Sequence, residues 1–180
     1  MMHKKDEQIQ RNLQKTCYEE VLEQKGILVY TNVGDSMRPL LRPKRDIIQI
    51  QALPKYISGV MRVKRYDAVL FKTRDKYILH RVLRVKKDGT YIIAGDNCAF
   101  CEKGIRDNQI LGVLVAVKRD GKVIPVDFNK ERRKGAVPPL SYRLYVHLIC
   151  DFFVLRKILF IARSYAYAFR RKLYFILKQR

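Results

Sequence analysis

The sequence lacks a hydrophobic run long enough to cross a bilayer. The longest uncharged apolar stretch near the C-terminus, residues 144–150, includes His147, and a membrane-spanning helix needs about 20 residues. Residues 1–15 are polar and charged, without the apolar centre of a secretory signal peptide. We therefore expect neither signal peptide nor spanning helix, and a cytoplasmic protein, with peripheral contact on the inner face of the membrane as an option.

Cysteine is also scarce. The four cysteines, Cys17, Cys98, Cys101 and Cys150, are too few and too irregularly spaced for a secreted disulfide framework, which favours a reducing compartment. Cys98 and Cys101 form a Cys-x-x-Cys pair, but a four-ligand zinc site needs a second pair, and the sequence offers none. We expect no metal and no cofactor, and we interpret these two residues as incidental loop cysteines.

Acidic residues are outnumbered by basic ones. The chain has 38 Lys and Arg against 17 Asp and Glu, a net charge of +21, while its 48% hydrophobic content excludes a disordered polyelectrolyte. Residues 130–180 carry thirteen Lys and Arg and two acids, so about half of the excess lies in this tail. Charge of this kind suits nucleic acid, an anionic membrane or an acidic partner, and composition alone does not choose among them.

Short β-prone runs between residues 27 and 126 predict a series of strands. We expect them at residues 27–33, 46–52, 68–72, 77–85, 91–94, 109–118 and 122–126. Turn signals at residues 87–89 (Lys-Asp-Gly) and 120–121 (Asp-Gly) would join neighbouring runs as hairpins. Successive hairpins without intervening helices predict a mainly β fold, an antiparallel sheet domain over residues 26–128.

Helices are expected on both sides of this domain. Residues 6–24 have apolar side chains every four positions and are followed by Gly26, which predicts an N-terminal helix within residues 1–25. Residues 129–180 divide into a basic linker, 129–139, and a helical part, 141–178. In that part Arg156, Arg163 and Arg170 form one seven-spaced set. A second seven-spaced set consists of Phe153, Phe160, Tyr167 and Tyr174.

These two sets indicate a basic amphipathic helix or pair of helices. Its apolar face could pack on the β domain, or residues 140–180 could lie on an anionic membrane surface with their Arg side chains at lipid phosphates. These two interpretations stay open. Nucleic acid is the less favoured partner, because no recognition motif accompanies the charge.

Three short blocks carry residues suited to catalysis. Ser36 follows a predicted strand and Gly34, where a turn can present its hydroxyl, and a serine needs a base such as histidine to accept its proton. His80 lies in an apolar strand, and Asp96 lies in the turn after the next strand. A hairpin would bring His80 and Asp96 to the same end of the sheet, where the carboxylate could orient the imidazole. Taken singly, each block has a structural explanation: residues 34–39 could form an ordinary turn with a capping serine, His80 could be a partly buried histidine, and residues 95–97 could be a turn.

In combination the blocks resemble the signature boxes of signal peptidase I and of LexA-like self-cleaving repressors. The resemblance covers residues 27–120. It rests on residues 34–39 (Gly-Asp-Ser-Met-Arg-Pro), 65–71 (Arg-Tyr-Asp-Ala-Val-Leu-Phe), 80–82 (His-Arg-Val) and 95–97 (Gly-Asp-Asn). In bacterial signal peptidases the base is a lysine. His80 at that position is similar to the Ser-His variant of endoplasmic-reticulum, archaeal and sporulation-type signal peptidases.

The resemblance implies a serine endopeptidase with a coiled antiparallel β-sheet. Ser36 would be the nucleophile, His80 the base, and a leader- or signal-peptide-like substrate would bind as an extended strand. The Ser36 N–H would be an oxyanion donor, whereas Gly34 stands where the family often has a second donor, a serine. In Ser-His relatives an acid about six residues beyond Asp96 also matters, and Glu102 stands there. Asp96 and Glu102 are equal candidates for the third group, with Asp107 next.

Two functions from different classes follow from the sequence. The first is an active peptidase acting on a peptide or protein substrate by acyl-enzyme chemistry. The second is a non-catalytic basic binding protein, for a membrane surface or nucleic acid, that retains the peptidase fold. The joint presence of Ser36, His80 and two candidate acids favours the first. A self-cleaving transcriptional regulator is disfavoured, because a single helix over residues 6–24 cannot form a helix-turn-helix.

Overall fold

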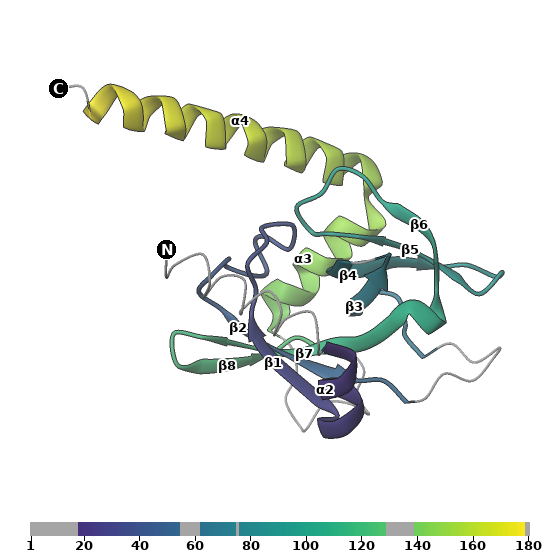
Figure 1. Cartoon of the computed structure of the whole chain (residues 1–180). Coiled ribbons are helices and arrows are strands. Elements are labelled where there is room, and N and C mark those ends of the chain that lie inside the picture. The colour runs from purple at the N-terminus through teal and green to yellow at the C-terminus, as the bar shows by residue number, and fades with distance from the viewer. Residues whose placement is uncertain (1–17, 55–61, 75, 129–138, 179–180) are drawn as a thin grey trace.

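The protein is built on one eight-stranded antiparallel sheet, seen in a computed structural model that describes residues 18–54, 62–74, 76–128 and 139–178 (Figure 1). The strand order is β1-β2-β7-β3-β4-β5-β6, and β8 pairs with β7. The strands are β1 (Ile27–Thr31), β2 (Ile47–Ala52), β3 (Ala68–Thr73), β4 (Lys76–Val85), β5 (Thr90–Ala94), β6 (Glu102–Arg106), β7 (Ile110–Arg119) and β8 (Lys122–Pro125). The predicted mainly β, antiparallel fold is confirmed.

Both predicted hairpins are present. β4 pairs with β5 across residues 86–89, and Gly89 there has a φ of 77°. β7 pairs with β8 with Arg119 opposite Lys122, which leaves Asp120 and Gly121 as a two-residue turn with φ of 49° and 80°. Positive φ at both central positions matches the strand twist, and Asp-Gly is among the dipeptides that adopt it most readily.

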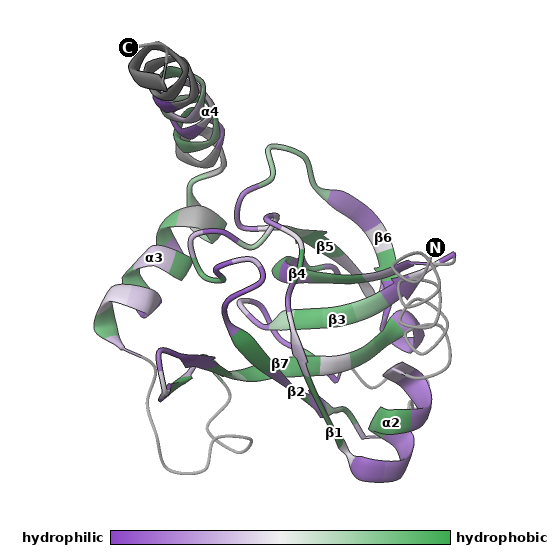
Figure 2. Ribbon diagram, turned by 60° about the vertical axis from the view of Figure 1, so that its left-hand side comes forward, coloured by the Kyte–Doolittle hydropathy of each residue, from purple (hydrophilic) through white to green (hydrophobic). Residues whose placement is uncertain are grey.

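β6 is the strand that the sequence did not predict. Its five residues bury only Ile105, so the alternation that marks a half-buried strand is weak. β6 forms by pairing with β5 at the edge of the sheet. Figure 2 shows this strand mostly in the hydrophilic colour, whereas β3 and β7 in the middle of the sheet are mostly in the hydrophobic colour.

The helices occupy the two ends of the chain, as expected. The N-terminal helix is described as α2 (Tyr18–Lys25), and the rest of its predicted range, residues 6–17, lies outside the described residues. It ends at Gly26, whose N–H donates to the Leu22 carbonyl at 2.9 Å. The linker predicted at residues 129–139 falls almost entirely outside the described residues.

The C-terminal part forms a pair of helices, α3 (Leu140–Asp151) and α4 (Phe153–Lys178), with a break at Phe152. α3 packs on the β domain through the fully buried Val146 and through Tyr142. α4 stands off from the sheet beyond α3 (Figures 1 and 2). Within the described residues, neither helix is long and apolar enough to cross a membrane.

The core consists of two clusters on the two faces of the sheet. Successive residues of a strand point to opposite faces. In β3, accordingly, Leu70 belongs to the cluster that contains Met37 and Leu114, whereas Val69 and Phe71 belong to the other. Any pair of side chains that is to react must therefore reach the same face.

Candidate active site

Ser36 lies in the turn that follows β1 and is held by its neighbours. The side chain of Met37 is 1% exposed in the core, which anchors the turn. The Arg38 N–H donates to the Asp35 carbonyl at 3.1 Å, and the Asn97 N–H donates to the Ser36 carbonyl at 2.7 Å. The 95–97 turn is therefore docked directly on the serine turn, although the two are about sixty residues apart in sequence.

His80 lies on β4 opposite Val69 of β3 and is 9% exposed. Its ring centroid is 6.2 Å from that of Phe71, on the face that also buries Val82. The next residue, Arg81, pairs with Ala94 of β5. As predicted, the hairpin brings His80 and the turn at Gly95 to the same end of the sheet.

The serine turn and the imidazole converge at Gly95. A Cβ placed on Gly95 would lie 2.6 Å from the Ser36 carbonyl oxygen, 2.8 Å from Cys98 Sγ and 2.9 Å from His80 Nε2. Two atoms that each lie within 3.0 Å of one point are at most twice that distance apart. Nε2 therefore lies within 6 Å of a main-chain atom of the serine turn, and only a residue without a side chain leaves room for this arrangement.

Asp96 is bound by Arg81. Arg81 Nε donates to Oδ1 at 2.8 Å and Nη2 to Oδ2 at 2.7 Å, and both side chains are fully buried. Burial alone would lower the pKa of Arg81, but the charge of Asp96 raises it well above the ordinary value, so the pair is ionic. Because Arg81 and His80 point to opposite faces of β4, this contact carries Asp96 away from the imidazole.

Glu102 is the carboxyl group beside His80. Its Oε1 lies 3.6 Å from Nδ1, the other ring nitrogen of His80. The Glu102 side chain is 38% exposed, but its Oε2 is buried, and burial raises the pKa of the carboxyl group. The strand that delivers Glu102 is β6, the one that the sequence did not predict.

Asp107, the third candidate acid, has a structural role at the end of β6. It accepts hydrogen bonds from Arg62 Nε at 2.6 Å and from the Tyr91 hydroxyl at 2.5 Å. The carboxylate is 5% exposed and belongs to the short helix η1 (Asp107–Gln109). Burial, reinforced by the hydrogen bond to Asp107, raises the pKa of Tyr91, so its hydroxyl stays a donor.

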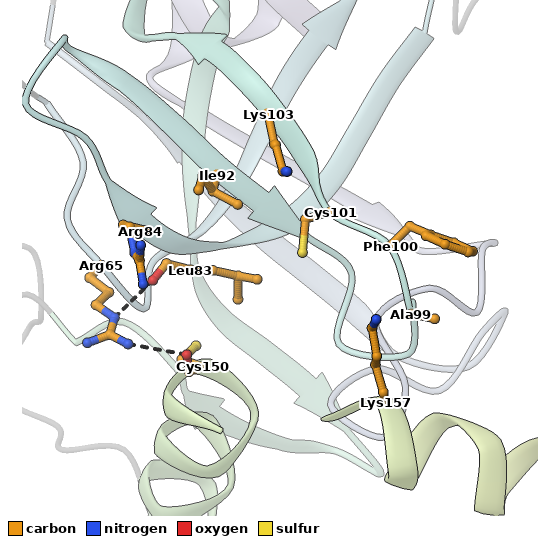
Figure 3. A pocket seen from close by; sticks show the side chains of 10 residues that line it. All are labelled: Arg65, Leu83, Arg84, Ile92, Ala99, Phe100, Cys101, Lys103, Cys150 and Lys157. Atoms are coloured by element: carbon orange, nitrogen blue, oxygen red, sulfur yellow. Dashed lines mark hydrogen bonds between the residues drawn. The ribbon is translucent and has the colours of Figure 1, made fainter. Parts of the chain in front are cut away.

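Cys98, which the sequence analysis did not include among the site residues, lies beside the imidazole. Its Sγ packs against Gly95 next to His80 Nε2, although we interpreted it as an incidental loop cysteine. The sequence feature that could have identified Cys98 is its position directly after residues 95–97 (Gly-Asp-Asn). Cys101, the other member of the pair, lines a separate hollow of about 450 Å³ with Arg65, Cys150 and Lys157 (Figure 3). The described residues contain no cluster of three metal-ligating side chains.

Two strand edges near the site are open among the described strands. β4 pairs with β5 only from Arg81 onward, so residues 76–80 have a strand neighbour on one side alone, and β1 is the end strand of the sheet. Tyr18 of α2 contacts both strands, with its ring centroid 5.1 Å from that of Tyr30 and 4.9 Å from that of Tyr77. The two open edges therefore approach each other near α2 and lead towards Ser36 and His80.

Comparison with known proteins does not assign this chain to a family. No protein-family model matches this chain, and no curated protein matches it in sequence. The likeness to signal peptidases therefore stays a prediction that rests on the motifs and on the geometry around Gly95.

Proposed function

We propose that the protein is a serine endopeptidase in which Ser36 is the nucleophile, His80 the general base and Glu102 the acid that supports the base. The convergence of the Ser36 turn and His80 Nε2 over Gly95 carries the proposal. A histidine that is 9% exposed and held by a β-strand is fixed in place, which a general base requires.

The chemistry is acyl transfer. His80 Nε2 takes the proton of the Ser36 hydroxyl as the oxygen attacks a peptide carbonyl, and the same proton then leaves with the amine as the peptide bond breaks. Water attacks the resulting ester by the reverse route and frees the carboxylate and Ser36. Glu102 beside Nδ1 stabilises the imidazolium formed in each step, and the Ser36 N–H donates to the oxyanion.

The substrate is an extended peptide of the leader- or signal-peptide type. Among the described strands, residues 76–79 of β4 have no neighbour on the side where β5 pairs from Arg81 onward, and an added strand there would bring a peptide bond to Ser36. Main-chain pairing supplies affinity for any extended segment, so side-chain pockets would select the sequence that is cleaved.

Labelling with a fluorophosphonate probe tests the proposal. The wild type should react, and Ser36→Ala and His80→Ala should each lower labelling to background. Ser164→Ala in α4 and His147→Ala in α3, which remove the same residue types elsewhere, should label like the wild type. Labelling that survives Ser36→Ala and His80→Ala would refute the site.

The alternative is the non-catalytic binding protein. The net charge of +21 favours binding to an anionic surface with or without catalysis. A folded wild type that does not label and does not cleave extended peptides would support this alternative over the peptidase.

A further inference from the structure

Helix α4 carries an exposed row of large apolar side chains. Along the helix, successive members of the row are three or four residues apart, which puts them on one face. The row consists of Ile158 (55% exposed), Ile161 (54%), Tyr165 (74%) and Phe169 (67%). An amphipathic helix that packs on its own protein buries such a face, and here the face is turned to solvent.

The opposite side of α4 looks towards the β domain. Phe160, Arg163, Tyr167 and Arg170 line one hollow together with residues 35 and 38 of the serine turn. The described members of the arginine set and of the aromatic set that we distinguished in the sequence therefore lie on the same side of the helix. The exposed row forms a third set, which is the apolar face of α4. Because its members are three or four residues apart, the search for seven-residue spacing did not find it.

The charge of this region indicates what covers the row. Residues 152–180 contain eight Lys and Arg and no Asp or Glu. A second copy of the chain would bring equal positive charge against it, which opposes self-association. Nucleic acid would neutralise the Lys and Arg side chains but leave the apolar row exposed to water. An anionic bilayer offers both phosphates for these cations and an apolar boundary for the row.

We propose that α4 lies in the headgroup region of an anionic membrane, with Ile158, Ile161, Tyr165 and Phe169 inserted. The helix has 26 residues, about 39 Å, and would lie along the surface. Since its inner side overlooks residues 35 and 38, the serine turn would be held beneath the bilayer surface. That second consequence, access to substrates at the membrane, rests on the proposed peptidase function; membrane binding does not.

Vesicle flotation of the full chain tests the proposal. The wild type should float with vesicles of phosphatidylcholine and phosphatidylglycerol, float at least about tenfold less with phosphatidylcholine alone, and be released by 0.5 M NaCl only in part, because the row is held by burial of apolar groups. The triple variant I161S/Y165S/F169S should bind anionic vesicles at least about tenfold more weakly. Circular dichroism verifies that the variant keeps its helices.

The chain supplies a matched control on the same helix. Tyr165→Ser and Tyr167→Ser remove the same side chain from positions that are 74% and 67% exposed, but only Tyr165 belongs to the row. Tyr165→Ser should weaken flotation several-fold more than Tyr167→Ser. Equal effects, or a triple variant that binds like the wild type, would overturn the proposal, as would light scattering that shows a dimer dissolved by the triple substitution.

Ser36→Ala separates this proposal from the proposed function. It should float like the wild type, because Ser36 does not belong to the row. If the wild type floats but no serine labels, the membrane proposal stands and the peptidase proposal fails. If serine labelling is present and flotation absent, the reverse holds.

Discussion

At the scale of single residues, Gly95 leaves room for the serine turn and the His80 imidazole to lie close together, and an added methyl group should push them apart. In Gly95→Ala the new Cβ would meet a main-chain oxygen of Ser36 at 2.6 Å, which cannot move without shifting the serine turn. We expect serine labelling to fall at least about tenfold and the free energy of unfolding to fall by about 1–3 kcal/mol. Labelling kinetics and urea unfolding measure the two effects.

Gly34→Ala is the matched control for this change. It lies two residues before Ser36, but a Cβ there would have no neighbour within 4 Å, and its φ is not in the left-handed region. Labelling and stability should stay close to wild type. If both glycine variants lose labelling equally, the effect comes from general disturbance of the turn, and the convergence at Gly95 is not what matters.

Neutralising Glu102 and neutralising Asp96 should have different effects on labelling and on folding stability. Burial raises the pKa of Glu102 above its ordinary value, so its ionised form lowers folding stability as pH rises through that pKa. Glu102→Gln should therefore keep or raise the melting temperature at pH 7 while labelling falls by about 10–100-fold. Asp96→Asn leaves the buried Arg81 charge uncompensated and should cost about 3–5 kcal/mol of unfolding free energy.

The same two measurements, labelling rate and thermal unfolding, decide the assignment. A Glu102→Gln variant that labels like the wild type would remove Glu102 from the mechanism. If Asp96→Asn kept wild-type stability, the buried pair with Arg81 would not have the role that its geometry indicates.

Cys98 should report on the state of the site. Because its Sγ shares the space at Gly95 with His80 Nε2, an alkyl group on Cys98 would crowd the imidazole and the serine turn. Treatment with N-ethylmaleimide should lower serine labelling at least about tenfold in the wild type, and Cys98→Ala should resist the treatment. A Cys150→Ala variant should remain as sensitive as the wild type. Loss of labelling in treated Cys98→Ala would locate the inhibition elsewhere.

At the scale of elements, the segment between the serine turn and β2 is fastened by Asp46. Its carboxylate accepts from the Arg42 N–H at 2.8 Å, from Arg42 Nε at 2.9 Å and from Arg119 Nε at 3.1 Å. Arg119 Nη2 also donates to the Leu40 carbonyl at 2.6 Å. Asp46 thus ties the loop that follows Ser36 to the end of β7.

This contact predicts a pH dependence. Burial would raise the pKa of Asp46, but the hydrogen bonds from Arg119 and Arg42 outweigh burial and lower it from 3.8 to about 2. The stabilisation is complete above pH 3.8 and is lost as pH falls through about 2. Asp46→Asn should cost about 1–3 kcal/mol at pH 7, with the gap to wild type narrowing as pH falls to about 2. The exposed Glu23→Gln should show no such gap, and a gap as large at pH 2 as at pH 7 would contradict the role of the charge.

The sequence predicted those strands whose signals lie in neighbouring residues of the chain. Seven strands were located because β-prone runs end at turn signals, as at Asp120-Gly121, and these depend only on neighbours in the chain. β6 was missed because it is held by the edge of β5 and has one buried residue. The site shows the same limit: Ser36 and His80 were named from motifs, but choosing between Asp96 and Glu102 required the face of the sheet on which each lies.

At the scale of the whole molecule, the two faces of the sheet separate His80 from Asp96. His80 and Glu102 lie together on one face, while Arg81 carries Asp96 to the other. There Arg81 Nη1 also donates to the Tyr66 carbonyl at 2.8 Å and to the Tyr142 hydroxyl of α3 at 3.2 Å. The strand that positions the imidazole is thus joined through its next residue to the helix that carries α4.

The net charge of +21 should make salt stabilise the fold. Like charges repel within the compact state, and 0.1 M salt screens exposed charges that are more than about 10 Å apart. The ion pairs Arg81–Asp96 and Arg62–Asp107 are buried and are screened much less. Raising NaCl from 20 to 300 mM should therefore raise the melting temperature by about 2–5 °C, measured by calorimetry. A melting temperature that falls with salt would mean that attraction within exposed ion pairs outweighs the repulsion between like charges, and would contradict this prediction.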